Sequence, residues 1–322
     1  MEVIAPAARP LGKSTREAFG EALRDLGYAR PDVVVVDADL NTSTRTQLFA
    51  VAFPDRFYNV GIAESNLVGV ASGLAACGKQ VWIASFGVFL LANAFDQLRM
   101  SVALPRLNVK LVGTHTGITV GEDGPSQMAV EDMALACALA GVRVFVPADE
   151  VETRAMVQAA AEIDGPVYIR CGRPPVPVVH ESGCVFRPGR ATVLREGSDL
   201  TLAANGIMVA ASLDAAEELA RQGLSARVLN LSSVKPIDED ALEQAARETG
   251  ALVVAEEHLA HGGLGSIVAR VLSARYPVPL GFVNLGDTYA ESGEPRALVE
   301  RYGLTAGAIA QAARAVVLRK PT

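Results

Sequence analysis

The stretch PDVVVVDADLNTSTR, residues 31–45, contains the pattern that decides the fold. Its four consecutive valines (33–36) form an uninterrupted β-branched run, which is typical of a strand buried on both faces of a parallel sheet. The polar cluster DADLNTSTR (37–45) begins where this predicted strand ends. In folds built from parallel strands, ligands bind outside the carboxyl ends of the strands. The stretch therefore predicts a parallel sheet with a polar site at its edge.

Strand-like and helix-like segments alternate on both sides of this stretch. Upstream, Ser14-Thr15-Arg16-Glu17 is a capping-box pattern, which predicts a helix that runs to about Tyr28. Downstream, short apolar runs rich in β-branched residues predict further strands, and the longer segments between them predict helices. The strands of this half are predicted at 57–61, 81–85, 108–113, 142–147 and 166–170, and the helices at 42–52, 64–78, 90–103, 130–140 and 150–163.

A second alternating unit follows, and a proline-rich segment precedes it. Strands are predicted at 199–205, 226–231, 251–257 and 279–285, and helices at 208–222, 238–248 and 264–275, with two more helices at the end. RPPVPVV (173–179) has three prolines in seven residues, and we expect it to be irregular. We therefore predict an α/β fold of two domains with mainly parallel sheets. The first domain is expected at 1–175, a linker at 176–190 and the second domain at 191–322.

Composition restricts the classes of partner. The chain has 322 residues, of which 50% are hydrophobic, and a net charge of −7. It has no basic stripe for nucleic acid or an anionic membrane, so we predict neither partner. No stretch approaches the roughly 20 apolar residues of a membrane-spanning helix, and the first residues lack the apolar core of a signal peptide. Four scattered cysteines, without a CxxC pair, predict free thiols and a cytoplasmic location.

Five side chains in or beside the polar clusters are candidates for chemistry, and each has an ordinary structural alternative. Glu64 is either a first-turn glutamate favoured by the helix dipole or a partly buried carboxylate placed for proton transfer. Phe86 and Phe89 are either core residues or a flat wall for an aromatic ligand. His115 is either a satisfied polar residue or a ligand contact. Arg173 is a solvated charge, like many arginines, unless a phosphate lies nearby.

Together, these motifs resemble the transketolase family in order and spacing. The likeness extends from Ser14 to the C-terminal helix. GEDGPSQM (121–128) is similar to the same loop of animal transketolases, whereas bacterial and yeast transketolases have a histidine at the position of Gln127. The segments that carry it are GIAESN (61–66), SFGVF (85–89), AFDQLRM (94–100), GTHTGITVGEDGPSQM (113–128), RCGRP (170–174), VKPIDEDAL (234–242) and EEHLAHGGLGS (256–266).

The resemblance implies a thiamine diphosphate cofactor, which performs the carbanion chemistry while the protein orients it. In the family, the glutamate that matches Glu64 hydrogen-bonds N1′ of the aminopyrimidine, and the residues that match Phe86 and Phe89 hold that ring. Asp123 matches an aspartate that contacts a substrate hydroxyl, and Gln127 matches a position that touches substrate oxygens. The residues that match the sugar-phosphate ligands of the family are Arg16, Ser43, His115 and Arg173. The resemblance thus implies catalytic roles for Glu64, His115 and Asp123.

One part of the family pattern is missing. Transketolases bind Mg²⁺ and the diphosphate through a GDG motif followed by an asparagine pair, and the nearest segments here, GEDG (121–124) and LGD (285–287), lack the asparagines. We therefore expect an N-terminal transketolase subunit to bind Mg²⁺ and the diphosphate, and this chain, without a metal site of its own, to be the β-type subunit of an α2β2 assembly. The implied reaction transfers a two-carbon ketol unit from a ketose phosphate to an aldose.

Several alternatives remain open at this point. The chain is also compatible with the β subunit of a 2-oxoacid dehydrogenase, with a 1-deoxyxylulose-5-phosphate synthase-like enzyme, or with a non-catalytic regulatory paralogue. Nicotinamide binding by GGLG (262–265) is disfavoured because GxGxxG is absent. A metal site in the EEHLAH segment (256–261) is disfavoured too, and we expect Glu256, Glu257, His258 and His261 to lie in a solvated loop.

Overall fold

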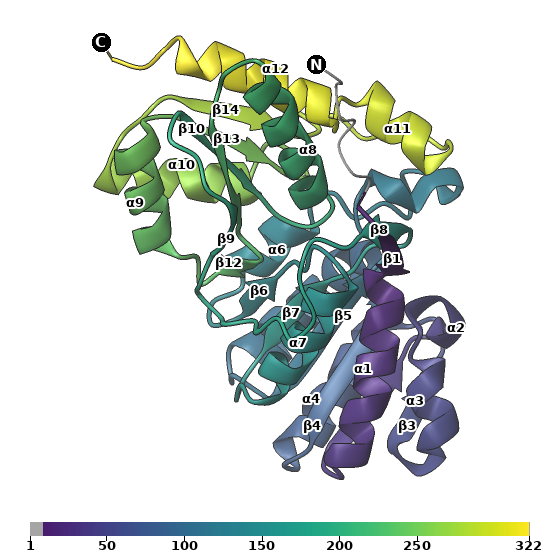
Figure 1. The fold of residues 1–322 in the computed structure, drawn as a ribbon. Coiled ribbons are helices and arrows are strands. Elements are labelled where there is room, and N and C mark those ends of the chain that lie inside the picture. The colour runs from purple at the N-terminus through teal and green to yellow at the C-terminus, as the bar shows by residue number, and fades with distance from the viewer. Residues whose placement is uncertain (1–8, 322) are drawn as a thin grey trace.

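The computed structural model describes residues 9–321, and in it the chain forms two α/β domains (Figure 1). The first domain contains a seven-stranded sheet and the second a five-stranded sheet, and a two-stranded sheet lies at their junction. Within the two large sheets, all strand pairs are parallel except one edge pair in each. The predicted fold class is therefore confirmed.

The first sheet has the order β12-β6-β7-β5-β4-β2-β3. Its edge strand β12 comes from the second half of the chain and pairs antiparallel with β6, which the sequence pattern did not predict. The strands of this sheet are β2 (Val33–Asp37), β3 (Phe57–Asn59), β4 (Gln80–Phe86), β5 (Val109–Thr114), β6 (Arg143–Phe145), β7 (Val167–Arg170) and β12 (Ser233–Lys235).

The valine run in β2 shows why this strand needs four β-branched residues. The first and third valines pack in one apolar cluster with α1 (Thr15–Ala29) and α7 (Glu150–Ala161). The second and fourth valines pack on the opposite face, in a cluster with α4 (Glu64–Ala76). Because side chains alternate along a strand, covering both faces with helices buries every position. All five residues of β2 are buried, as predicted.

The helices of the first domain follow the predicted segments. At α1, Ser14 is the N-cap, and its Oγ accepts a hydrogen bond from the Glu17 N–H at 3.3 Å, as the capping pattern predicted. The helical stretch near 90–103 contains two π-helical segments, Phe89–Asn93 and Leu98–Ala103. The other helical elements are α2 (Asn41–Thr44), α3 (Gln47–Ala52), α5 (Phe95–Gln97), α6 (Asp132–Ala138) and the 3-10 segments Pro54–Arg56 and Ile118–Asp123.

The second sheet has the order β14-β13-β10-β11-β9. Its strands are β9 (Thr192–Arg195), β10 (Leu200–Ala204), β11 (Ala226–Asn230), β13 (Leu252–Ala255) and β14 (Leu280–Val283). The helices are α8 (Met208–Arg221), α9 (Glu239–Thr249), α10 (Leu264–Arg275), α11 (Pro295–Arg301) and α12 (Ala306–Val317). α8 and α12 pack on one face and α9 and α10 on the other. None of the helices within residues 9–321 has the length and apolarity to cross a membrane.

The expectation that RPPVPVV is irregular was wrong. Pro175–Pro177 forms strand β8, which pairs antiparallel with β1 (Leu11–Ser14). This is an isolated two-stranded ladder, where a proline without an N–H is tolerated on the side that faces no partner. Val176 is buried at 3% exposure, and the next residue but one, Val178, donates its N–H to the Pro10 carbonyl at 2.9 Å. The start of the chain's described part is thus fastened to the segment that leaves the first domain.

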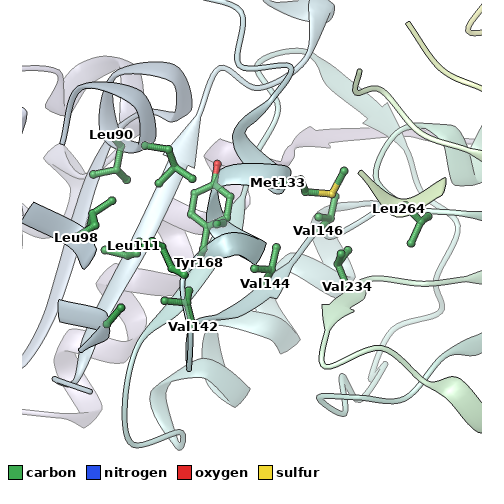
Figure 2. Packing of buried hydrophobic residues seen from close by; sticks show 14 of the residues in the cluster. Leu90, Leu98, Leu111, Met133, Val142, Val144, Val146, Tyr168, Val234 and Leu264 are labelled. Carbon is green, nitrogen blue, oxygen red and sulfur yellow. The ribbon is translucent and has the colours of Figure 1, made fainter. Parts of the chain in front are cut away.

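An apolar core joins the two domains. One continuous cluster runs from Leu111 and Tyr168 in the first sheet to Val234 and to Leu264 at the start of α10 (Figure 2). Met133 of α6 belongs to the same cluster and lies between these two ends in the view. Because the apolar packing is continuous, the second domain is held at a defined position relative to the edge of the first sheet.

Candidate active site

The candidate site lies at the carboxyl edge of the first sheet. Strands β2, β4, β5 and β7 are close neighbours in this sheet, and they are parallel. Their last residues are Asp37, Phe86, Thr114 and Arg170. Residues that follow parallel strands meet at one edge, so polar clusters far apart in sequence are brought together here.

Glu64 is the first residue of α4 and is 4% exposed. Its Oε1 accepts a hydrogen bond from Ser85 Oγ at 3.2 Å, and its Oε2 accepts one from Asn93 Nδ2 at 3.1 Å. A carboxylate offers about four acceptor positions, so these two bonds leave others for a ligand. Glu64 is thus both the first residue of its helix and a buried carboxylate with hydrogen-bond partners. Ser85 and Asn93 were not singled out from the sequence, because nothing local indicates that they face α4.

Three rings stack beside this carboxylate. The Phe86 and Phe89 rings are nearly parallel, with an interplanar angle of 11° and centroids 5.7 Å apart. The imidazole of His115 stacks on Phe86 at a centroid distance of 3.7 Å. Ser85 therefore holds Glu64 while the next residue, Phe86, holds His115. The predicted aromatic pair and the predicted histidine form one continuous shelf.

The hydrogen bonds of His115 define its protonation state. Nε2 lies 3.0 Å from Nη1 of Arg16, and because a guanidinium can only donate, Nε2 is the acceptor. Nδ1 then carries the proton and donates to Thr114 Oγ1 at 3.0 Å, and that hydroxyl donates to the Ser85 carbonyl at 3.3 Å. Burial, followed by the positive charges of Arg16, Arg173 and Arg45, lowers the pKa of His115 to about 3. The imidazole is therefore neutral at physiological pH.

Arg16 projects from the first turn of α1 toward the same place. Besides His115, its Nη1 donates to the carbonyl oxygen of Ser43 at 2.9 Å. Burial and the charges of Arg45 and Arg173 lower the pKa of Arg16 to about 10, which still leaves it charged at neutral pH. Ser43 thus reaches the site through its backbone. Its hydroxyl has no hydrogen bond within residues 9–321 and remains available to a ligand.

Arg173, Asp123 and Gln127 lie at the rim. Arg173 Nη1 donates to the Val120 carbonyl and lies 3.9 Å from Asp123 Oδ1. Asp123 ends the 3-10 segment Ile118–Asp123 and is exposed. Gln127 is half-buried, and its Oε1 accepts from the neighbouring Ser126 hydroxyl at 2.6 Å. Gln127 lies on the same loop as Asp123, and no hydrogen bond within residues 9–321 links it to the other predicted residues.

Two residues of the DADLNTSTR cluster complete the arrangement, although the sequence did not single them out. Asp37 is fully buried and accepts hydrogen bonds from the Leu40 N–H at 2.7 Å, from Thr44 Oγ1 at 2.9 Å and from Thr46 Oγ1 at 2.8 Å. Burial raises the pKa of Asp37 above its ordinary value. Arg45 lies between the two threonines and contributes positive charge to the surroundings of Arg16 and His115.

The second domain contacts the loop that contains His115, through residues that were expected in a solvated loop. That expectation was wrong for Glu256, Glu257 and His258, which are at most 4% exposed, whereas His261 is exposed. Glu257 Oε1 accepts from the Thr119 N–H at 2.8 Å, in the loop that contains His115. Gly117, at φ +79°, lies so close to this carboxylate that a Cβ there would come within about 2.0 Å of it.

A buried ion pair sits at the same junction. Arg170 Nε lies 2.9 Å from Asp132 Oδ2, and Arg170 also donates to the carbonyl oxygens of Ala129 and Glu257 at 3.0 Å. Tyr168 donates its hydroxyl to Asp132 at 2.6 Å. Polar groups of the EEHLAH segment are therefore hydrogen-bonded to residues of the first domain, and the local sequence could not reveal these distant partners.

These residues fit part of an aromatic, heterocyclic cofactor. Glu64 offers a buried carboxylate with free acceptor positions, and Phe86 and Phe89 offer a flat apolar wall beside it. An anionic group fits at the other end, where Arg16 contacts His115 and Arg45 and Arg173 add positive charge to its surroundings. Within residues 9–321, no group of three or more histidine, cysteine, aspartate or glutamate side chains is placed to hold a metal ion.

Comparison with known proteins identifies both halves of the chain. Residues 12–178 match the family described as transketolase, pyrimidine binding domain, and residues 189–309 match transketolase, C-terminal domain. The chain is 44% identical to the 6-deoxy-6-sulfo-D-fructose transketolase subunit SqwH of Clostridium sp., over 92% of each chain. It is 35% identical to a protein of Phocaeicola vulgatus named as a subunit of apulose-4-phosphate transketolase, over 90% of this chain and 93% of that protein. A solved structure described as a split gene transketolase, inactive beta4 tetramer, superposes with a TM-score of 0.89 at 50% identity, covering 96% of this chain and all of the other.

Proposed function

Since the chain belongs to the transketolase family, we propose that it is the β-type subunit of a split transketolase. The reaction transfers a two-carbon ketol unit from a ketose with a terminal phosphate or sulfonate to an aldose. Thiamine diphosphate is the cofactor, and it lies between this chain and an N-terminal transketolase subunit that binds Mg²⁺ and the diphosphate. The assembly is α2β2.

The observation that carries this proposal is the sequence of contacts from Glu64 to Arg16. Glu64 is bonded to Ser85, Phe86 follows Ser85 and stacks on His115, and His115 is bonded to Arg16. A carboxylate for a heterocycle and a cation for a substrate anion are thus held on one rigid edge of the sheet. This is the arrangement needed to orient a cofactor and a sugar with respect to each other.

Each residue then has a definite task. When bound, thiamine diphosphate supplies the carbanion chemistry. Glu64 holds a proton at N1′ of the aminopyrimidine, and Phe86 and Phe89 fix the plane of that ring. Arg16 and Arg173 orient the sugar through its terminal anion. The remaining members of the set contact the substrate at the rim or beside the arginines: Ser43, His115, Asp123 and Gln127.

The substrate class follows from the cationic end of the site and agrees with the names of two relatives. SqwH is named for a sulfonated fructose, and the Phocaeicola vulgatus protein is named for a sugar phosphate. Both of the sugars named carry a tetrahedral acidic group, and guanidinium groups bind such a group through paired hydrogen bonds. The proposed donor substrate is therefore a ketose that carries a terminal phosphate or sulfonate.

A partner chain is supported by the extent of the similarity. The chain spans more than nine-tenths of two relatives that are named as subunits, and the similar structure of β chains alone is described as inactive. The four cysteines are all free thiols, which fits the proposed cytoplasmic location.

The test begins with purification of the chain together with its partner from the native source. The complex should form sedoheptulose phosphate from pentose phosphates or an analogous product from a sulfonated ketose. Titration with thiamine diphosphate and Mg²⁺ should show tight binding to the complex and weak binding to this chain alone. Tight Mg²⁺-dependent binding by the isolated chain would contradict the split-site proposal.

Two outcomes would select an alternative. Decarboxylation of pyruvate by the complex, without ketol transfer, would favour the 2-oxoacid dehydrogenase or 1-deoxyxylulose-5-phosphate synthase class. A Glu64→Gln variant should assemble normally and lose about 10²- to 10⁴-fold in turnover. Glu239→Gln is the matched control, since Glu239 is also the first residue of a helix but lies in the second domain. If Glu64→Gln keeps full activity, the regulatory paralogue is the better interpretation.

A further inference from the structure

Two guanidinium groups at the site have buried donors without a partner. The Nε atoms of Arg16 and Arg45 are both inaccessible to solvent and make no hydrogen bond within residues 9–321. Buried polar atoms are nearly always paired, so these donors show that the chain itself leaves part of the hydrogen-bonding capacity of both guanidinium groups unused. Arg173 forms ion pairs with Glu122 and Asp123. Within residues 9–321, Arg16 and Arg45 form none.

The position of Arg45 relative to Arg16 follows from helix α1. Gly20 is one turn after Arg16, on the same face of the helix. A Cβ at Gly20 would lie 2.5 Å from the Cβ of Arg45 and 2.6 Å from its carbonyl oxygen. Arg45 therefore packs directly against α1, one turn from Arg16, and Figure 1 shows α2, which ends at Thr44, beside α1. Only glycine at position 20 allows this approach.

The backbone at Arg45 is held in an unfavourable conformation. Its φ is +69°, in the left-handed region that arginine rarely adopts. The residues on either side, Thr44 and Thr46, both donate their hydroxyls to the buried carboxylate of Asp37. Such strain persists where the surroundings determine it, and it is concentrated at ligand sites. The strained backbone and the threonine anchors fix where the Arg45 side chain starts.

We propose that Arg45 is a third guanidinium of the anion site and determines its preference for a substrate whose terminal tetrahedral oxyanion is doubly charged. The proposal deepens the function proposed above and rests on it. Arg16 and Arg45 bind the oxyanion through their terminal N–H groups, while Arg173 closes the site from the rim. A phosphate ester carries up to two negative charges and a sulfonate carries one, so an added positive charge favours the phosphate ester more strongly. The neutral His115 contributes a hydrogen-bonding ring but no charge to this balance.

The direct test is titration of the full chain with inorganic phosphate. Binding is monitored through the ring ¹⁵N signals of the histidines. Methanesulfonate serves as the singly charged probe. Arg45→Gln should raise the Kd for phosphate about 10- to 100-fold, as expected for loss of hydrogen bonds to a charged group, and should raise the Kd for methanesulfonate less. Arg24→Gln is the matched control, because Arg24 lies on α1 but pairs with Asp25 at 2.7 Å. Its Kd values should equal those of the wild type.

Catalysis by the assembled complex gives a second, independent readout. Arg45→Gln should lower kcat/KM for a phosphorylated ketose about 10- to 100-fold more than for erythrulose, a ketol donor without an acidic group. Arg45→Lys, which keeps the charge but not the planar fork, should fall between the wild type and Arg45→Gln, and it serves if Arg45→Gln does not fold.

The possible results separate this inference from the proposed function. Equal phosphate affinity in the wild type and a folded Arg45 variant, or no phosphate binding by the wild type, overturns the role of Arg45 even if ketol transfer is found. Arg45-dependent phosphate binding without ketol transfer supports the anion site and rejects the proposed reaction. Equal losses for phosphate and methanesulfonate would remove the preference for a doubly charged group.

Discussion

The protonation of His115 is the most direct test of the geometry at the site. Its pKa of about 3 compares with an ordinary value of 6.5. At pH 5, an unperturbed histidine is about 97% protonated, whereas this ring should be about 1% protonated. The cause is burial together with three nearby guanidinium groups, so the ring should stay neutral throughout the range in which other histidines titrate.

The lowered pKa also makes a contribution to stability that depends on pH. Below pH 6.5 the unfolded chain binds a proton at this residue and the folded chain does not. The free energy of unfolding is therefore unaffected by this residue above pH 6.5, and it falls as the pH drops from 6.5 toward 3. At pH 5 the loss amounts to about 2 kcal/mol. The free energy of unfolding should therefore fall less between pH 7.5 and 5 in His115→Gln than in the wild type, by about 2 kcal/mol.

The assay is a ¹H–¹⁵N correlation spectrum of the histidine rings, recorded from pH 8 to pH 4.5. His115→Gln assigns the signal, since the chain has only four histidines. We expect the shifts of a neutral ring with the proton on Nδ1 and no titration above pH 4.5. An apparent pKa near 6.5, or a proton on Nε2, would refute the contact with Arg16 and the electrostatic reasoning that depends on it.

Three further perturbations probe the support around the site. Arg170→Met should destabilise the chain by about 3–5 kcal/mol in urea unfolding, because it leaves Asp132 buried without its counter-ion, and adding Asp132→Asn should recover part of the loss. Asp37→Ala should cost about 1–3 kcal/mol and weaken phosphate binding, since it frees both threonines beside the strained residue 45; unchanged phosphate affinity would contradict the anchoring role. Burial raises the pKa of Glu256 to about 7. The folded chain therefore keeps a proton that the unfolded chain loses between about pH 4.5 and 7, and the free energy of unfolding should fall by about 3 kcal/mol over this range. Glu256→Gln should remove that fall, and an identical pH profile would show that another group causes it.

Much of the fold was predictable because it depends on local patterns. The valine run, the capping box before α1 and the apolar spacing of α10 each lie within a single element, and α10 begins and ends where the pattern indicates. Parallel strands also place their following loops at one edge, so a site at this edge was predictable, whereas the stacking of His115 on Phe86 was seen only in the structure. The roles proposed for these residues come from the resemblance to transketolases.

Other features could not be predicted, because the partner that decides them lies far along the chain. The proline-rich strand β8 exists because β1 pairs with it, and β12 exists because it finds the open edge at β6. Glu257 and His258 look like a solvated polar loop until the 117–119 loop and α6 cover them. Strand pairing and burial are properties of contacts, and no window of sequence contains both sides of a contact that spans 138 residues.

The sequence by itself thus determined the two α/β domains, the edge where the site lies and the residue types gathered there, since these follow from hydrophobic period and strand direction. Only the tertiary structure decided the electrostatics: a neutral His115, the hydrogen bonds that hold Glu64, and the closeness of Arg45 to Arg16. The physical reason is that the charge state and the free donors of a side chain depend on how far water is excluded and on which groups replace it.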